Sequence, residues 1–281
     1  MRVGALGAIL GHVVDAQVGM VTPVPLLLFW TAAALLTSES WTTAAPAAPP
    51  RQSGSRARWF GAALVAAALV TVLVGWISTR WLLASVAYAS GVRHGIAGQL
   101  SEAYGDFRRS VTLAPWLPLP AESAAYTALR LATAESRPAR RIALLEEAED
   151  LLSQARDHAV GGPGSWALKA QIAFAVARTT GQPSQFAASR EAFAVALKLR
   201  PDDPRLLAQS AWVWLESGDP AQARRAAEQA LAREPREWMA WAVLARVAKV
   251  SGDPPRAQQA TARARELAPP EALPLLDSLL R

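Results

Sequence analysis

The chain has 281 residues, of which 52% are apolar, and a formal net charge of +6. It contains no cysteine, which excludes disulfides and thiolate metal sites. Basic and acidic residues alternate along the chain without a basic stripe carrying aromatic side chains. The positive charge therefore indicates solvated, ion-paired helix faces and argues against a nucleic-acid partner.

Residues 1–41 contain two apolar stretches. The stretch VPLLLFWTAAALLT, residues 24–37, predicts a membrane helix when it is extended to about Trp41. The opening VGALGAILGHVVDAQVGM is the weaker candidate for a span, because His12 and Asp15 interrupt it. The same interruption argues against the alternative of a signal peptide. His12 and Asp15 share a helix face, so we expect an intramembrane polar pair, with a catalytic role as the less favoured alternative.

Residues 42–58 form a linker rich in Pro, Ala and Arg, and an uncharged run of 21 residues, Trp59 to Thr79, follows it. That length crosses a hydrocarbon layer of about 30 Å, so residues 59–80 are predicted to be a transmembrane helix. Arginines in the linker place it in the cytoplasm by the charge bias of membrane proteins. We therefore expect the rest of the chain outside the cytoplasm.

The later part of the chain repeats itself with a period of 34 residues. GDPAQARRAAEQALAREP begins at Gly218, and GDPPRAQQATARARELAP begins at Gly252. Each GDP predicts a helix end followed by a helix start, because glycine suits a left-handed C-terminal conformation, aspartate caps the next helix and proline suits its first turn. Small residues such as Ala223 and Ala230 recur where two helices must approach closely.

This helix-turn-helix unit resembles the tetratricopeptide repeat in its period, turn and alanines. Similar copies occupy Gly98–Pro115 and residues 165–201, and a degenerate copy occupies residues 122–160. The fold class is therefore predicted to be all-α, with two to three transmembrane helices followed by an α-solenoid of about five helix pairs. The solenoid domain is predicted to cover residues 84–281, with EALPLLDSLLR covering its last apolar face.

The resemblance implies that the first helix of each pair lines an inner groove. Five residues then fall on that face: Gln171, Arg178, Trp212, Arg246 and Lys249. The basic groups and the indole suit an acidic or carboxylate-bearing peptide. The alternative is that Trp212 packs against a neighbouring repeat and the cations are solvated.

A second resemblance concerns Gly11 to Leu36, GHVVDAQVGMVTPVPLLLFWTAAALL. This segment is similar to the closing membrane segment of bacterial O-antigen ligase and polymerase-like proteins, in which a histidine and an acidic residue precede a glycine, a break and a helix containing Phe-Trp. Those proteins often continue with another membrane helix and tetratricopeptide repeats. The large extracytoplasmic loop and the many membrane helices that their catalysis requires have no counterpart in this sequence, so no catalytic residue is carried over.

Two hypotheses follow. In the first, the chain is a noncatalytic, membrane-anchored module that binds a protein or peptide partner and serves envelope polysaccharide ligation or polymerisation, alone or with other polysaccharide-assembly membrane proteins. In the second, it is a portion of the glycosyl-transferring enzyme itself and works only with further membrane helices. The three histidines have no metal-ligand spacing and no phosphate-binding glycine loop occurs, so we expect no metal and no cofactor.

Overall fold

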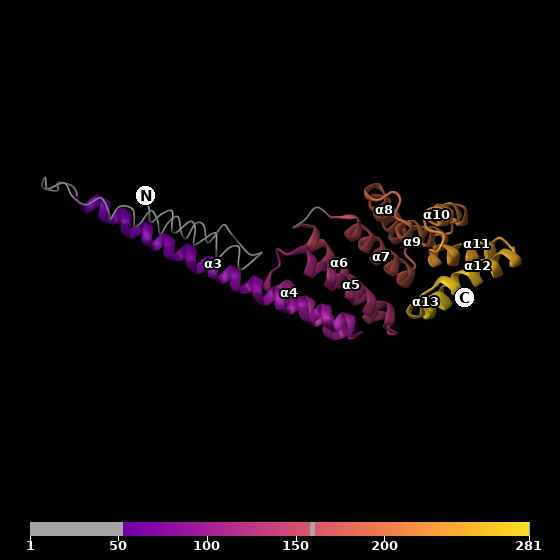
Figure 1. Ribbon diagram of the computed structural model, residues 1–281, viewed down its shortest axis with the longest axis horizontal. Helices are drawn as coiled ribbons and strands as arrows, with labels where there is room; N and C mark the ends of the chain where they lie inside the picture. Colours follow the sequence, from indigo (N-terminus) through magenta and orange to yellow (C-terminus); the bar gives the residue numbers. More distant parts are fainter. Residues whose placement is uncertain (1–52, 158–160, 281) are drawn as a thin grey trace. The chain divides into compact units, whose positions relative to one another are not determined.

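The computed structural model describes residues 53–157 and 161–280 and divides the chain into two compact units, Met1–Leu83 and Ala84–Arg281 (Figure 1). The membrane segments predicted within residues 1–41, with His12 and Asp15, lie outside the described residues. These segments therefore remain predictions from the sequence.

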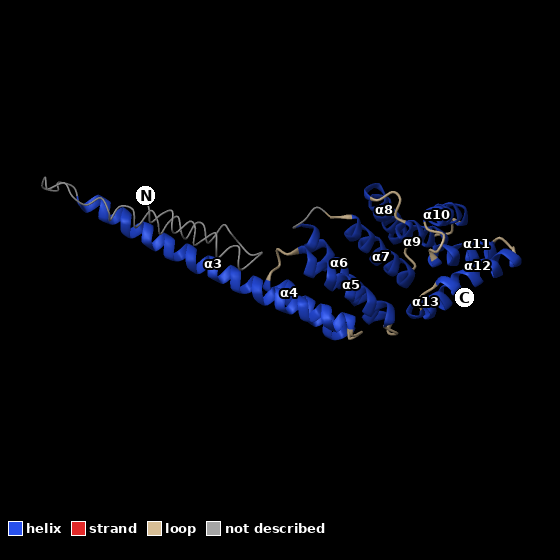
Figure 2. Cartoon of the chain, in the orientation of Figure 1, coloured by secondary structure: helices blue, strands red, loops and turns tan. Residues whose placement is uncertain are grey.

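The described residues fold into helices joined by short loops (Figure 2). The α-helices are α3 (Ser53–Ile96), α4 (Leu100–Leu113), α5 (Pro118–Ala134), α6 (Pro138–Asp157), α7 (Pro163–Thr180), α8 (Pro183–Leu199), α9 (Pro204–Glu216), α10 (Pro220–Arg233), α11 (Trp238–Val250), α12 (Pro254–Leu267) and α13 (Leu273–Leu280). A short 3-10 helix, η2 (Pro270–Ala272), precedes α13.

Helix α3 contains the apolar run that was predicted to span a membrane. It begins at Ser53, inside the segment predicted to be a linker, where Arg56, Ala57 and Arg58 favour helix and lead into the apolar run. Large apolar side chains such as Leu69, Val72 and Trp76 are exposed along it. Among the described residues, one helix segment, Val72–Ile96, is long and apolar enough to cross a membrane by length and composition.

The last part of α3 belongs to the second unit and packs against α4. The Ser110 hydroxyl donates a hydrogen bond of 2.8 Å to the backbone carbonyl of Ala84. Gly91 faces the Phe107 ring so closely that an added Cβ would lie 2.7 Å from it. The segment from Ala84 onward therefore acts as the first helix of a pair whose second helix is α4.

Four further pairs follow along the second unit: α5 with α6, α7 with α8, α9 with α10, and α11 with α12. Together with the first pair they make the five pairs that the described residues form, in agreement with the predicted all-α solenoid. The apolar clusters that hold the pairs together are composed of residues from 84–281. Because its core is its own, the fragment 84–281 is suited to study as a separate protein.

The two GDP turns have the predicted geometry. Gly218 and Gly252 adopt φ angles of 87° and 70°, the left-handed conformation that glycine adopts at no steric cost. The Asp219 carboxylate accepts a hydrogen bond of 2.9 Å from the backbone amide of Gln222, and Asp253 caps α12 in the same way. Helix α10 then buries only alanines: Ala223, Ala227 and Ala230.

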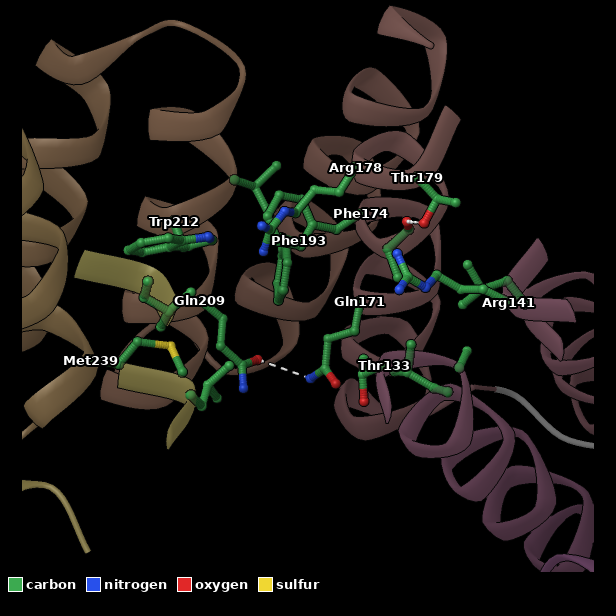
Figure 3. A pocket seen from close by; sticks show the side chains of 17 residues that line it. Thr133, Arg141, Gln171, Phe174, Arg178, Thr179, Phe193, Gln209, Trp212 and Met239 are labelled. Atoms are coloured by element: carbon green, nitrogen blue, oxygen red, sulfur yellow. Dashed lines mark hydrogen bonds between the residues drawn. The ribbon is translucent and has the colours of Figure 1, made fainter. Parts of the chain in front are cut away.

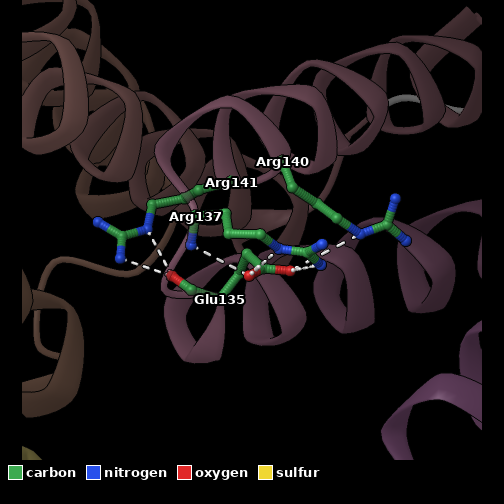
Figure 4. Close-up of polar contacts among 4 residues, drawn as sticks. All are labelled: Glu135, Arg137, Arg140 and Arg141. Atoms are coloured by element: carbon green, nitrogen blue, oxygen red, sulfur yellow. Dashed lines mark hydrogen bonds and ion pairs between the residues drawn. The ribbon is translucent and has the colours of Figure 1, made fainter.

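The turn between α5 and α6 is built differently, around Glu135 (Figure 4). Its carboxylate accepts hydrogen bonds of 3.1 and 3.0 Å from the Arg137 guanidinium and lies 3.7 Å from the Arg140 guanidinium. Its backbone carbonyl accepts two hydrogen bonds from Arg141. The hydrogen bonds from Arg137 lower the pKa of Glu135 to about 2. Arginine side chains thus hold a turn that lacks the glycine and aspartate of the GDP turns.

Candidate binding groove

A cavity of about 530 Å³ opens on the solenoid face to which the first helices of the pairs contribute most (Figure 3). Its apolar lining includes one residue from each of five helices, Leu129, Leu145, Phe174, Phe193 and Met239. Because these residues are spread over three pairs, the cavity exists only when the pairs are stacked. A side chain that enters it would contact several repeats at once.

Two glutamines meet across this cavity. The Gln171 side-chain amide on α7 donates a hydrogen bond of 3.1 Å to the side-chain oxygen of Gln209 on α9 (Figure 3). Gln171 was predicted to face the groove, whereas Gln209 was missed. The repeat itself could have indicated Gln209, because it lies 38 residues after Gln171 in the next first helix. The spacing exceeds the 34-residue period because α7 and α8, with 18 and 17 residues, are longer than α9 and α10, with 13 and 14.

Two arginines give the cavity its charge. Arg178 of α7 and Arg141 of α6 line it, and no aspartate or glutamate is among the described residues that do. The Arg178 guanidinium carbon lies 6.0 Å from the centroid of the Phe174 ring, which is within the range of a cation–π contact. Arg141 was not predicted, because α6 belongs to the degenerate repeat, where the sequence gives no frame for the inner face.

Glu216 stands between two of the predicted basic residues. Its carboxylate lies 4.0 Å from the Arg178 guanidinium and 3.9 Å from that of Arg246. One carboxylate at these long distances neutralises at most one of the two cations, so a net positive charge remains. Arg246 and Lys249, at the end of α11, do not line the cavity, although both were predicted to face the groove.

Trp212 both packs against neighbouring helices and lines the cavity, the two roles that the sequence left open. Its side chain is 5% exposed and belongs to the cluster that joins α9 to α10 and α11, so it packs against neighbouring helices. It also lines the cavity, where its ring lies opposite Arg178 (Figure 3). The indole N–H is buried and has no hydrogen-bond partner among the described residues.

Helix α13 contributes the remaining wall of the cavity. Leu275 and Leu279, one helical turn apart, both line it. Leu276 is fully buried in a cluster with Ala242 and Ala264 on the last repeat. The last apolar face is therefore covered as predicted, and the same apolar face of α13 extends to the edge of the groove, which the sequence did not indicate.

A second cavity of about 640 Å³ lies among α4, α5 and α6. Tyr104, Arg108 and Glu147 line it, and the Arg108 and Glu147 side chains form an ion pair. Burial and the neighbouring Glu147 carboxylate raise the pKa of Tyr104 well above its usual range. A phenol held neutral in this way is not a base, and the cations and carboxylates of this cavity balance each other.

Metal ligands do not gather in the described part of the chain: no group of three or more His, Asp or Glu residues is placed to hold an ion there. The His94 ring nitrogen Nδ1 lies 2.9 Å from the Asp106 carboxylate and ties α3 to α4. A hydrogen bond from Ser90, and to a smaller extent the one with His94, lowers the pKa of Asp106. The pair stabilises a helix contact and faces neither cavity.

The fold agrees with comparisons against known proteins. Residues 214–280 match the family model of the tetratricopeptide repeat (TPR). A thermophilic TPR protein of Thermus thermophilus superimposes with a TM-score of 0.56 at 20% identity, covering 70% of this chain and 98% of that one. The described solenoid has the TPR fold.

A TPR protein from Parabacteroides merdae gives a similar result. Its TM-score is 0.55 at 11% identity, and the superposition covers 100% of this chain and 98% of the other. A search of curated proteins gave no significant match. At these identities the likeness establishes the TPR fold alone, so the function has to be inferred from the groove.

Proposed function

We propose that the TPR solenoid is a protein-interaction module whose groove binds a peptide segment with a carboxylate and a large apolar side chain. The observation that supports this most directly is the lining of the cavity, which combines aromatic and aliphatic side chains with Arg141 and Arg178 and, in its described part, no acidic residue. Arg178 can form two parallel hydrogen bonds to a carboxylate, and such charge-assisted bonds are stronger than neutral ones. Arg141 adds its positive charge, since two of its guanidinium nitrogens already donate to the Glu135 carbonyl.

Peptide binding to the fragment 84–281 tests this proposal. Peptides that contain both a glutamate and a leucine should bind, and the double variant Arg141→Glu, Arg178→Glu should bind them about tenfold or more weakly with an altered salt dependence. Arg225→Glu is the matched control, because Arg225 is exposed on α10 away from the cavity. Equal affinity of the double variant and the control, with both folded, would contradict the proposal.

The predicted residues outside the cavity have their own experiment. The triple variant Arg178→Glu, Arg246→Glu, Lys249→Glu reverses the charges that were expected on the groove face. If Arg246 and Lys249 contribute to binding, this variant loses more affinity than Arg178→Glu alone. Equal losses would assign the charge contribution to Arg178.

We also propose that α3 anchors the module in a bacterial cytoplasmic membrane with the solenoid outside the cytoplasm. Exposed apolar side chains along residues 65–77 support this, since a water-exposed helix of that composition would be costly. Charged residues on α4, including Asp106 and Arg109, argue that the span ends before Ala84, where contact with α4 begins. A span that ends before Ala84 agrees with the predicted residues 59–80 and not with Val72–Ile96.

Reporter fusions test the anchoring. Alkaline phosphatase fused after Arg281 should be active, because it folds only outside the cytoplasm. Full-length protein should remain in the membrane fraction after a high-salt or carbonate wash, whereas the fragment 84–281 should be soluble. Activity of a cytoplasm-only reporter at the same position would contradict the orientation.

The role in envelope polysaccharide assembly is a further proposal that rests on the O-antigen ligase-like segment, Gly11 to Leu36. The noncatalytic module is favoured, and a portion of the glycan ligase or polymerase is the alternative. Inspection of the reading frame upstream distinguishes them: about ten more apolar spans in frame would support the enzyme. A frame without them would support the separate module.

A further inference from the structure

The loop between α4 and α5, which joins the first pair to the second, is apolar and exposed (Figure 2). No charged residue occurs between Arg109 and Glu122, and the turn itself reads APWLPLP. The side chains of Trp116 and Leu119 are 38% and 55% exposed. Two large apolar side chains on one exposed turn are unfavourable in water, so the loop is a candidate contact surface.

Later turns of the same kind carry charged residues at the same place. Two of them lie wholly within the described residues, between α8 and α9 and between α10 and α11. One residue after the proline that follows the second helix, where the first turn has Trp116, these turns have Asp202 and Arg236, and all three side chains are exposed. The repeat itself therefore does not require an apolar side chain here.

The next position shows the same replacement at a residue with a local role. Asp203 and Glu237 are the N-cap residues of α9 and α11, and their carboxylates accept hydrogen bonds of 3.0 and 3.2 Å from backbone amides of the first turn. Leu117 is the N-cap residue of α5 and makes no side-chain cap hydrogen bond. Helix formation alone does not favour leucine over aspartate at this position.

Two side-chain hydrogen bonds fix where this loop lies along α3. The Ser110 hydroxyl near the end of α4 donates to the Ala84 carbonyl, and the Ser123 hydroxyl near the start of α5 donates to the Tyr88 hydroxyl over 3.5 Å. The loop between these two serines is therefore held beside the first turns of the second unit, where α3 enters it. This end of the unit follows directly on the proposed span, residues 59–80.

From this placement we propose that the α4–α5 loop rests in the headgroup layer of the same lipid bilayer that α3 is proposed to span, with Trp116 and Leu119 inserted among the lipids. The inference rests on the proposed anchoring and gives the solenoid a second membrane contact. Tryptophan is enriched at this interface because its ring is amphipathic. The absence of charge in the loop removes the main cost of insertion.

The experiment uses the full chain, which has no cysteine, so that one substitution introduces a unique site for an environment-sensitive fluorophore. Pro115→Cys places the label in the loop and keeps both apolar side chains, and Pro235→Cys places it at the matched, equally exposed proline between α10 and α11. Each protein is reconstituted in phosphatidylcholine vesicles that contain lipids spin-labelled at the headgroup. We expect the label at position 115 to be quenched about threefold more strongly than the label at position 235, because only the first turn reaches the headgroups.

A second set of variants tests whether the apolar side chains hold the loop in place. Trp116→Asp with Leu119→Asp, made in the Pro115→Cys protein, should reduce the quenching at position 115 to the level at position 235. Leu199→Asp is the control, because Leu199 is also an exposed leucine but lies on α8 in another pair. It should leave the quenching unchanged, and circular dichroism checks that each variant is folded.

A label at Leu69→Cys, inside the proposed span, separates this inference from the anchoring. If lipids spin-labelled in the acyl chain quench position 69 but position 115 is quenched no more than position 235, the loop contact is wrong and the anchoring stands. If position 69 is not quenched, the anchoring fails and the loop contact with it. A blue-shifted label at position 115 that lipids do not quench would assign the loop to a protein contact and would also overturn the inference.

Discussion

The pairs α5–α6 and α9–α10 have the same order of helices but are held together by side chains of different sizes. In α6 the buried residues are mainly leucines, with Leu145 and Leu152 almost completely enclosed. In α10 they are three alanines. The first pair is stabilised by apolar volume, and the second by close approach of two helix backbones. A repeat can therefore keep its shape after losing its sequence signature.

The largest effect is expected where the close approach is broken. Ala230→Arg forces a long charged side chain between α10 and its neighbours at a position that is fully enclosed. We expect a loss of about 4 kcal/mol, from overpacking together with a buried charge. Chemical denaturation of the fragment 84–281 measures it. An unchanged midpoint would show that α10 does not approach its neighbours so closely.

A cavity in the leucine-rich pair should cost somewhat less. Leu145→Ala removes a side chain that is 1% exposed and leaves a void between α5 and α6. The expected loss is about 3 kcal/mol in the same denaturation experiment. Leu145 also lines the candidate groove, so the variant should bind groove ligands more weakly even under conditions in which it is folded. If Leu145→Ala costs no more stability than truncation of an exposed leucine, then α5 and α6 are not tightly packed around this residue.

The turns offer a smaller and more selective contrast. Gly218→Ala places a Cβ on a residue with a φ angle of 87° and should destabilise the fragment by about 1–2 kcal/mol. Gly105→Ala is the control, because Gly105 lies exposed inside α4 with open space around it. That change should stabilise the protein by about 1 kcal/mol. The same sign for both substitutions would contradict the left-handed turn.

The weakest effect is expected at the arginine-held turn of Glu135. Its pKa of about 2 is lower than the ordinary 4.5, so the carboxylate stabilises the folded state fully above about pH 4.5 and progressively less as the pH falls toward 2. Glu135→Gln should remove that pH dependence and lower the stability slightly at neutral pH, a small loss because Arg137 is exposed and the ion pairs are screened by salt. NMR titration of Glu135 in moderate salt measures the pKa directly. A normal value would mean that the Glu135 carboxylate does not contribute to the turn, which the Arg141 side chain would still hold through the Glu135 carbonyl.

These contrasts explain which features the sequence could predict. Gly218, Asp219 and Ala223 act through local rules of turns, caps and helix spacing, so their roles follow from the printed order of residues. Contacts between residues that are far apart in the sequence leave no local pattern of this kind. The hydroxyls of Ser110 and Ser189, for example, replace alanines and donate to the carbonyls of Ala84 and Ala170 on the facing helices.

The candidate groove was predictable to a similar extent. Three of the five expected residues, Gln171, Arg178 and Trp212, line the cavity, whereas Arg246 and Lys249 of α11 do not, although their repeat has a clear frame. Arg141 was missed because its repeat is degenerate. The contribution of α13 was missed because an apolar segment of eight residues does not indicate which neighbouring helices its apolar face will border.

The three buried alanines of α10 also restrict which mutations this chain can accumulate. Any residue other than glycine or serine at Ala223, Ala227 or Ala230 is larger than the space between the helices, so nearly every missense change at these codons meets a steric barrier. A leucine position such as Leu145 can instead move among isoleucine, methionine and valine. In a saturation library selected for folded protein, the three alanine positions of α10 should therefore accept almost no substitution. The leucine positions of α6 should accept several apolar residues while the helix keeps its shape.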